Sequence, residues 1–178
     1  MPRKLRIWYP GSIYHITSRG NRHSDIFLDD KDRLRYLHHV EKTKAWLLPH
    51  TNHVHLLIET MQYPISDIMH KLNSCYSISF NRRNDHDEHL FQGRYHSVLI
   101  ESIDNSRLTN RYIYLNPVKA NIVKNPAEYK WSSYKAFQIG KPNMQVNPTL
   151  ILHYFQTPQN YKRYVMRGSA LPPTHKKD

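Results

Sequence analysis

The order in which strand-like and helix-like segments follow one another is the feature that most constrains the fold of this chain. Four short segments are apolar or alternate between apolar and polar residues, as strands do. They are residues 11–18, 45–49, 53–59 and 94–102. Three longer segments carry apolar residues at helical spacing. They are residues 28–44, 64–84 and 104–116. The order strand, helix, strand, strand, helix, strand, helix predicts an α+β protein with a ferredoxin-like βαββαβ core.

Helices in such a fold cover one face of an antiparallel sheet, and the other face is left to carry a site. Along residues 53–59 the side chains alternate between the two faces. Val54, Leu56 and Ile58 fit the face against the helices. His53 and His55 then fall on the opposite face. The segment therefore predicts two imidazoles side by side on the face without helices.

Local signals predict where the helices begin and end. Asp29 or Asp30 is expected to cap the first helix, and Asp104 or Asn105 the last one. Pro117 is expected to end the last helix, because the residue before a proline disfavours helical geometry. The apolar face of the first helix is expected to consist of Leu34, Leu37 and Val40.

The two histidines have more than one interpretation. Neutral imidazole binds divalent metals well, so His53 and His55 are candidate ligands of one ion. Two histidines on a solvated sheet face are also an ordinary polar surface, and the spacing alone leaves this interpretation open. His50, in the preceding turn, adds a third alternative, which is a zinc site of three histidines.

A tyrosine and an asparagine in the last helix form a second constellation. Tyr112 and Asn116 are four residues apart, so they share a helix face, whereas Tyr114 points elsewhere. A deprotonated phenol is a nucleophile, and an amide oxygen is a hard metal ligand. The same residues are also compatible with a buried tyrosine and an asparagine that precedes a proline.

The charge of the chain favours a polyanionic partner. The formal net charge is +12 and the pI is about 9.8, which suits nucleic acid or an anionic membrane surface. Trp8, Tyr9 and Trp131 are candidates for stacking on unpaired bases, although Trp131 fits the core better. The candidate phosphate contacts are Arg3, Lys4, Arg6, Arg19, Arg22 and Arg94.

Two further features bear on the compartment. The basic start of the chain is not followed by an apolar region, so we expect no secretory signal. Cys75 is the only cysteine, which excludes an internal disulfide and a cysteine metal site. A cytoplasmic, nucleoid-associated protein is therefore expected.

Four ordered motifs, "NHVHLLIE", "FQGRYHSVLIES", "YIYLNPVKA" and "WSSYKAF", run together in this chain. They resemble the REP-associated branch of the single-tyrosine insertion-sequence transposases, within the HUH endonuclease superfamily. The superfamily signature is histidine, hydrophobic residue, histidine, which here is His53-Val54-His55. The resemblance extends from about residue 5 to residue 137.

The resemblance implies a role for each candidate residue. His53 and His55 would be the paired metal ligands, Asn116 the third ligand and Tyr112 the nucleophile. The metal would be Mg²⁺ or Mn²⁺, and two imidazoles favour Mn²⁺. The implied activity is that of a metal-dependent transposase. It would cleave and transfer single-stranded DNA with a hairpin, from a repetitive extragenic palindrome or a transposon end, through a 5′-phosphotyrosine.

Two alternatives of another class stay open. One is a catalytically silent nucleic-acid-binding module, and the other is a metal-dependent phosphohydrolase that uses water. In members of the family a longer stretch separates the first helix from the histidine strand, whereas here only "AWLLPHT" does. A lost second strand would put activity in doubt, because that strand should pair beside the histidines.

The expected organisation is an HUH-type catalytic domain over residues 1–140, followed by a partly flexible C-terminal extension over residues 141–178. A monomer is expected, and a dimer is the alternative.

Overall fold

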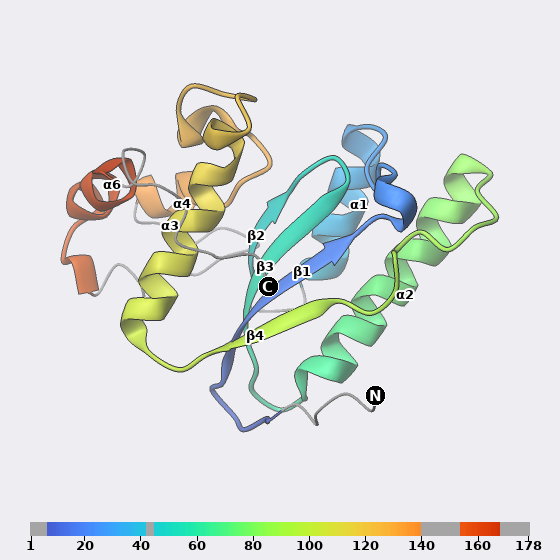
Figure 1. Ribbon diagram of the computed structural model, residues 1–178, viewed down its shortest axis with the longest axis horizontal. Helices are drawn as coiled ribbons and strands as arrows, with labels where there is room; N and C mark the ends of the chain where they lie inside the picture. Colours follow the sequence, from blue (N-terminus) through green and yellow to red (C-terminus); the bar gives the residue numbers. More distant parts are fainter. Residues whose placement is uncertain (1–6, 42–44, 140–153, 168–178) are drawn as a thin grey trace.

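Four strands form one antiparallel sheet in a computed structural model that describes residues 7–41, 45–139 and 154–167 (Figure 1). The strands are β1 (Ile13–Arg19), β2 (Ala45–Pro49), β3 (His53–Glu59) and β4 (His96–Ile100). Their order in the sheet is β2-β3-β1-β4, and each neighbouring pair is antiparallel. This topology confirms the predicted ferredoxin-like plan.

Helices lie on both sides of the sheet, so the molecule has three layers (Figure 1). One side carries α1 (Asp30–Val40) and α2 (Ile65–Asn84). The other side carries α3 (Ile103–Lys119), α4 (Tyr134–Ile139) and α6 (Pro158–Arg167). Two 3₁₀ helices complete the described elements, η1 (Asn21–His23) and η2 (Pro126–Glu128). None of the helices in the described part of the chain is long and apolar enough to cross a membrane.

The first hydrophobic core lies between the sheet and helices α1 and α2. Tyr14 and Ile16 of β1 and Val54, Leu56 and Ile58 of β3 belong to it, and each is at most 2% exposed. Full burial of such a side chain stabilises the fold by roughly 1.5–3 kcal/mol. These residues confirm the predicted alternation, because the aliphatic positions of β3 face the helices.

Helix α1 buries most of the face that its apolar spacing predicted, because Val40 is fully buried and Leu37 packs against the first core. The Asp29 side chain caps it by accepting a hydrogen bond from the Asp32 backbone N–H (3.0 Å), as expected. The prediction for Leu34 was wrong, because this side chain is 59% exposed and Tyr36 is buried in its place. Asp32 lies on the buried face and pairs with Arg83 of α2 at 2.6 Å. The side of α1 that carries Asp32 therefore faces α2.

The opposite face of the sheet is partly covered. Leu57 of β3 belongs to a second core with Ile113 of α3, Phe137 of α4 and Tyr161 of α6. The described part of the C-terminal extension, residues 154–167, thus packs onto α3 and α4. The boundary near residue 140 falls outside the described residues and stays a prediction.

Both ends of α3 differ from the sequence prediction. The cap is Ser102, whose side chain accepts a hydrogen bond from the Asn105 backbone N–H (3.1 Å), and not Asp104 or Asn105. The helix also continues through Pro117 to Lys119. Pro117 is buried in the last turn, so its packing offsets the single backbone hydrogen bond that it removes.

A complete second strand lies beside the histidine strand. β2 pairs with β3 along its whole length, with Leu48 opposite His55 and Pro49 opposite Val54. The short "AWLLPHT" segment is therefore long enough for the strand and the turn. The doubt about activity that rested on a lost strand no longer has a structural basis.

Candidate active site

Three imidazoles meet at the start of β3. His50 lies in the β2–β3 turn, which a hydrogen bond from its backbone N–H to the carbonyl oxygen of His53 (2.8 Å) closes. The candidate ligand nitrogens of His50, His53 and His55 all lie within 4.8 Å of one another. His50 and His55 are buried, and His53 is half-buried. The predicted pair is therefore present, and the structure adds His50 to it.

Neighbouring side chains orient the rings. The Nδ1 atom of His55 lies 3.1 Å from Nε2 of His15 and 3.3 Å from the Thr17 hydroxyl oxygen, both on β1. Nδ1 of His53 lies 2.7 Å from the side-chain oxygen of Asn52. Such partners fix the tautomer of a ligand histidine and leave its other nitrogen for an ion. Nε2 of His50 is buried and has no hydrogen-bond partner among the described residues.

The electrostatics favour neutral rings. Burial, with a smaller contribution from the neighbouring His53, lowers the pKa of His50 to about 4. Burial also lowers the pKa of His53 to about 4, with a smaller contribution from Arg19. Burial holds the pKa of His55 well below its usual range, and His15 and the other two histidines add to this effect. All three rings are then neutral at pH 7, which is the form that binds a metal. The cluster thus fits a divalent ion.

Helix α3 places one of its tyrosines beside the histidines. The ring of Tyr112 is half-buried and lies edge-on to His55, with 6.1 Å between the ring centroids. The ammonium group of Lys119 is 5.6 Å from the centroid of the Tyr112 ring. Tyr114 points into the second core instead, where its hydroxyl is 2.7 Å from the Ser133 hydroxyl. Burial raises the pKa of Tyr114 above its usual range.

Asn116 is half-buried and follows Tyr112 by one helical turn. No hydrogen bond or ring contact joins its side chain to the histidines within the described part of the chain. Its role as third ligand therefore stays a prediction, and His50 occupies the neighbourhood of the pair.

The basic candidates lie in different places. Arg19 is exposed at the end of β1, opposite His53 in the strand pairing. Arg22 and Arg94 are exposed in the loops that follow β1 and precede β4. Arg3, Lys4 and Arg6 lie outside the described residues.

The aromatic candidates differ in exposure. Trp8 and Tyr9 are exposed, at 38% and 49%. Trp131 is half-buried, and cations approach its ring, with Arg33 at 5.6 Å and Lys130 at 4.6 Å from the centroid. Trp131 thus lies neither in the core nor free on the surface.

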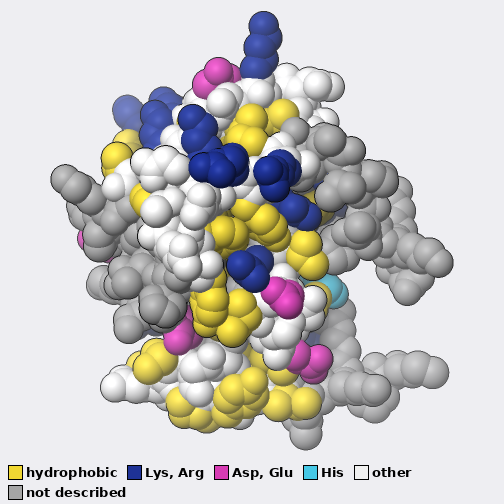
Figure 2. All heavy atoms as spheres, turned by 90° about the vertical axis from the view of Figure 1, so that its left-hand side faces the viewer, with side chains coloured by type: hydrophobic (Ala, Val, Ile, Leu, Met, Phe, Trp, Pro, Cys, Tyr) yellow, Lys and Arg dark blue, Asp and Glu magenta, His cyan; other side chains and the backbone are white. Residues whose placement is uncertain are grey.

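Sequence reasoning missed several contributors to the site. His15 and Thr17 alternate along β1 in the same way as the histidines along β3, and this signal could have placed them on the same face. A further basic region was missed as well. Figure 2 shows Lys and Arg side chains gathered on part of the face that α3, α4 and α6 present. Exposed basic residues of these helices include Lys119, Lys135, Lys162 and Arg163.

Comparison with known proteins decides the family. The family model described as "Transposase IS200 like" matches residues 11–116. The chain belongs to the IS200-like transposase family. By family, it is a DNA transposase. The match covers the sheet, both crossover helices and α3 as far as Asn116, so the cluster and Tyr112 lie within it. No curated protein matches the chain.

The chain is similar to solved structures. One is a REP-associated tyrosine transposase bound to a REP hairpin, with a TM-score of 0.62 and 20% sequence identity. The likeness covers 82% of this chain and 90% of that one. Another is a Deinococcus radiodurans protein assigned as a transposase, with a TM-score of 0.42 and 18% identity over 62% of this chain and 95% of that one. The first likeness places this IS200-like transposase in the fold of the REP-associated enzymes.

Proposed function

We propose that this IS200-like transposase is a metal-dependent endonuclease and strand transferase for single-stranded DNA with a hairpin, and that Tyr112 is its nucleophile. The observation that carries this proposal is the position of Tyr112, edge-on to His55 in a cluster of neutral imidazoles. Tyr114 is buried away from that cluster. The hairpin bound to the structurally similar REP-associated transposase supports the choice of substrate.

The reaction would be a transesterification. The Tyr112 oxygen forms a bond to phosphorus, and the bond from phosphorus to the 3′ oxygen breaks. The phenol loses its proton, and the leaving oxygen gains one to become a 3′-hydroxyl. A divalent ion at the histidines would supply Lewis-acid polarisation of the scissile phosphate. No water is consumed, so the phosphotyrosine keeps the bond energy that rejoining needs.

The protein residues would position the DNA for this step. His53 and His55 would hold the ion at the start of β3, and α3 places Tyr112 beside His55. Lys119 lies beside the Tyr112 ring, where its ammonium group suits a phosphate oxygen. Arg19, at the end of β1 opposite His53, suits a neighbouring phosphate of the strand. Fixed groups of this kind save the entropy of orienting the reactants.

The third protein ligand has two candidates. The family resemblance implies Asn116, whose amide oxygen would suit Mg²⁺ or Mn²⁺. The buried, unpartnered Nε2 of His50 favours His50 instead. Three imidazoles would shift the preference towards Zn²⁺ or Co²⁺.

A denaturing gel tests the proposed function. The protein is incubated with Mn²⁺ and hairpin-bearing single strands from the DNA around its own gene. We expect a covalent protein–DNA band that needs metal and is lost in Tyr112→Phe. Cut DNA without such a band would indicate a phosphohydrolase that uses water. Binding without cutting would indicate a silent binding module. Either result would overturn the proposal.

A further inference from the structure

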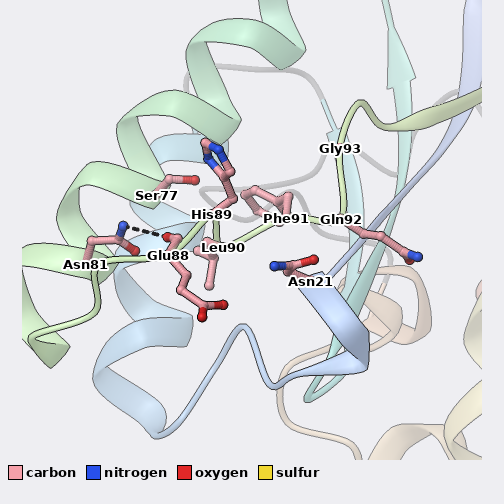
Figure 3. Close-up of a pocket in the computed structure, with 9 residues that line it drawn as sticks. All are labelled: Asn21, Ser77, Asn81, Glu88, His89, Leu90, Phe91, Gln92 and Gly93. Carbon is pink, nitrogen blue, oxygen red and sulfur yellow. Dashed lines mark hydrogen bonds between the residues drawn. The ribbon is translucent and has the colours of Figure 1, made fainter.

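A cavity lies outside the histidine cluster, between α2 and the loop that leads into β4 (Figure 3). Its volume is about 440 Å³, within the range of roughly 300–1,000 Å³ that is usual for small-molecule sites. Ser77 and Asn81 of α2 line one side, and Asn21 of η1 lines the other (Figure 3). The ring of Phe91 lies between them in this view. The cavity therefore combines hydrogen-bonding groups with one aromatic ring.

Some hydrogen-bonding groups of the cavity have no partner in the described part of the protein. The Asn81 amide nitrogen donates to the carbonyl oxygen of Glu88 (3.1 Å), which fixes the orientation of the amide (Figure 3). The Asn81 side-chain oxygen is then left buried with no partner among the described residues. The Asn21 side-chain amide makes no hydrogen bond to the described part of the chain either. A buried acceptor that lacks a partner is costly, so a ligand with a matching donor would be favoured.

A planar heterocycle with amino and carbonyl groups on its edge fits this chemistry. Asparagine amides pair with base edges through one donor and one acceptor, and aromatic rings stack on unpaired bases of any sequence. The cavity thus has the features of a site for one nucleobase.

The cavity is joined to the active site through the backbone that follows β1. Asn52, whose side chain contacts His53, also donates from its amide to the carbonyl oxygen of His23 in η1 (3.4 Å). The Gly20 backbone N–H donates to the carbonyl oxygen of Asn52 (2.9 Å), and Asn21, the next residue, lines the cavity. These hydrogen bonds tie the cavity residue Asn21 to the start of β3, where His53 lies.

Two basic residues are sequence neighbours of residues that line the cavity. Arg22 follows Asn21, Arg94 follows Gly93 of the lining, and both are exposed. Arg22 and His23 have positive φ angles of 49° and 65°, which are uncommon for residues other than glycine and often occur at functional sites. The two guanidinium groups suit the phosphates on either side of a base that enters the cavity.

We propose that this cavity binds one unpaired base of the single-stranded DNA, close to the scissile phosphate. In this proposal Asn21, Asn81 and Ser77 contact the base edge and Phe91 stacks on the ring. The inference rests on the proposed function only in that a DNA strand is held at the histidines. It concerns recognition of the strand and not the chemistry of Tyr112.

A binding experiment with abasic DNA tests the proposal. The probe is the hairpin-bearing single strand of the cleavage assay, with one nucleotide at a time made abasic, and binding is followed by fluorescence anisotropy in EDTA. We expect one position at which loss of the base weakens binding to the wild type by about tenfold. Asn21→Ala should lose about tenfold on the intact strand and almost nothing on the strand that is abasic at that position.

Two further variants complete the experiment. Phe91→Leu keeps an apolar side chain but removes the aromatic ring. Like Asn21→Ala, it should weaken binding of the intact strand and have almost no effect on the strand that is abasic at the sensitive position. Gln62→Ala removes an exposed amide at the other end of β3 and should bind every strand as the wild type does. The proposal is wrong if Asn21→Ala and Phe91→Leu bind all strands like the wild type. The proposal is also wrong if the two variants bind every abasic strand more weakly than the wild type by the same factor. Their effect would then not depend on the presence of one base.

The outcome separates this inference from the proposed function. A covalent adduct at Tyr112 without a position-dependent effect of Asn21→Ala would leave the chemistry intact and exclude the base site. A position-dependent effect without any adduct would support the base site in a protein that binds DNA but does not cleave it.

Discussion

The three histidines of the cluster are buried or half-buried, and this sets how metal binding should respond to pH. The pKa values of His50 and His53 are lowered to about 4. A lower pKa means weaker proton binding, so protons should not compete with the metal until the pH approaches 4. We expect nearly equal Co²⁺ affinity at pH 7.0 and 5.5 by absorption titration, and a steep loss below about pH 5. A loss of tenfold or more between pH 7.0 and 5.5 would show that the rings titrate like exposed histidines.

Single substitutions also decide whether His50 or Asn116 is the third metal ligand. If His50 is the third ligand, His50→Ala should weaken Co²⁺ binding by about tenfold or more and change the absorption spectrum of the bound Co²⁺. Asn116→Ala, the matched change on α3, should then leave both nearly unchanged. The reverse pattern would restore Asn116 as third ligand, as the family resemblance implies.

Among the elements, α3 matters most for the site because it carries Tyr112. Its cap is Ser102, so Ser102→Ala should lower the free energy of unfolding by about 1 kcal/mol in urea denaturation. Ser102→Asp should keep the stability, since aspartate is an equally good cap. Asn105→Ala should have little effect, because only the Asn105 backbone takes part in the cap. A larger loss for Asn105→Ala than for Ser102→Ala would mean that the cap is misassigned.

The same elements show what local sequence can and cannot predict. The faces of β3 were predictable, because strict alternation leaves only one way to bury Val54, Leu56 and Ile58. The burial of Asp32 in α1 was not, because Asp32 is kept inside by Arg83, more than fifty residues away in the sequence. The position of His50 likewise depends on how β2 pairs with β3. The spacing of the histidines along the sequence does not reveal this pairing.

At the scale of the whole molecule, the net charge of +12 and the basic face in Figure 2 predict strong salt dependence of DNA binding. Each neutralised phosphate of a single strand should contribute about −0.7 to the slope of log K against log[salt]. Arg22→Gln and Arg94→Gln should each make the slope shallower by about that amount, as measured by anisotropy between roughly 50 and 200 mM salt. A flat dependence for the wild type would mean that the basic surface does not contact the DNA.

The central claim is that Tyr112 is the nucleophile, and the most direct test is to find the residue that carries the nucleotide. The covalent adduct formed with Mn²⁺ is digested with protease and nuclease, and mass spectrometry locates the modified peptide and residue. We expect a nucleotide on Tyr112, no adduct in Tyr112→Phe with metal binding kept, and a normal adduct in Tyr114→Phe. A nucleotide on Tyr114 or any other residue, or cleavage by Tyr112→Phe at the wild-type rate, would contradict this claim.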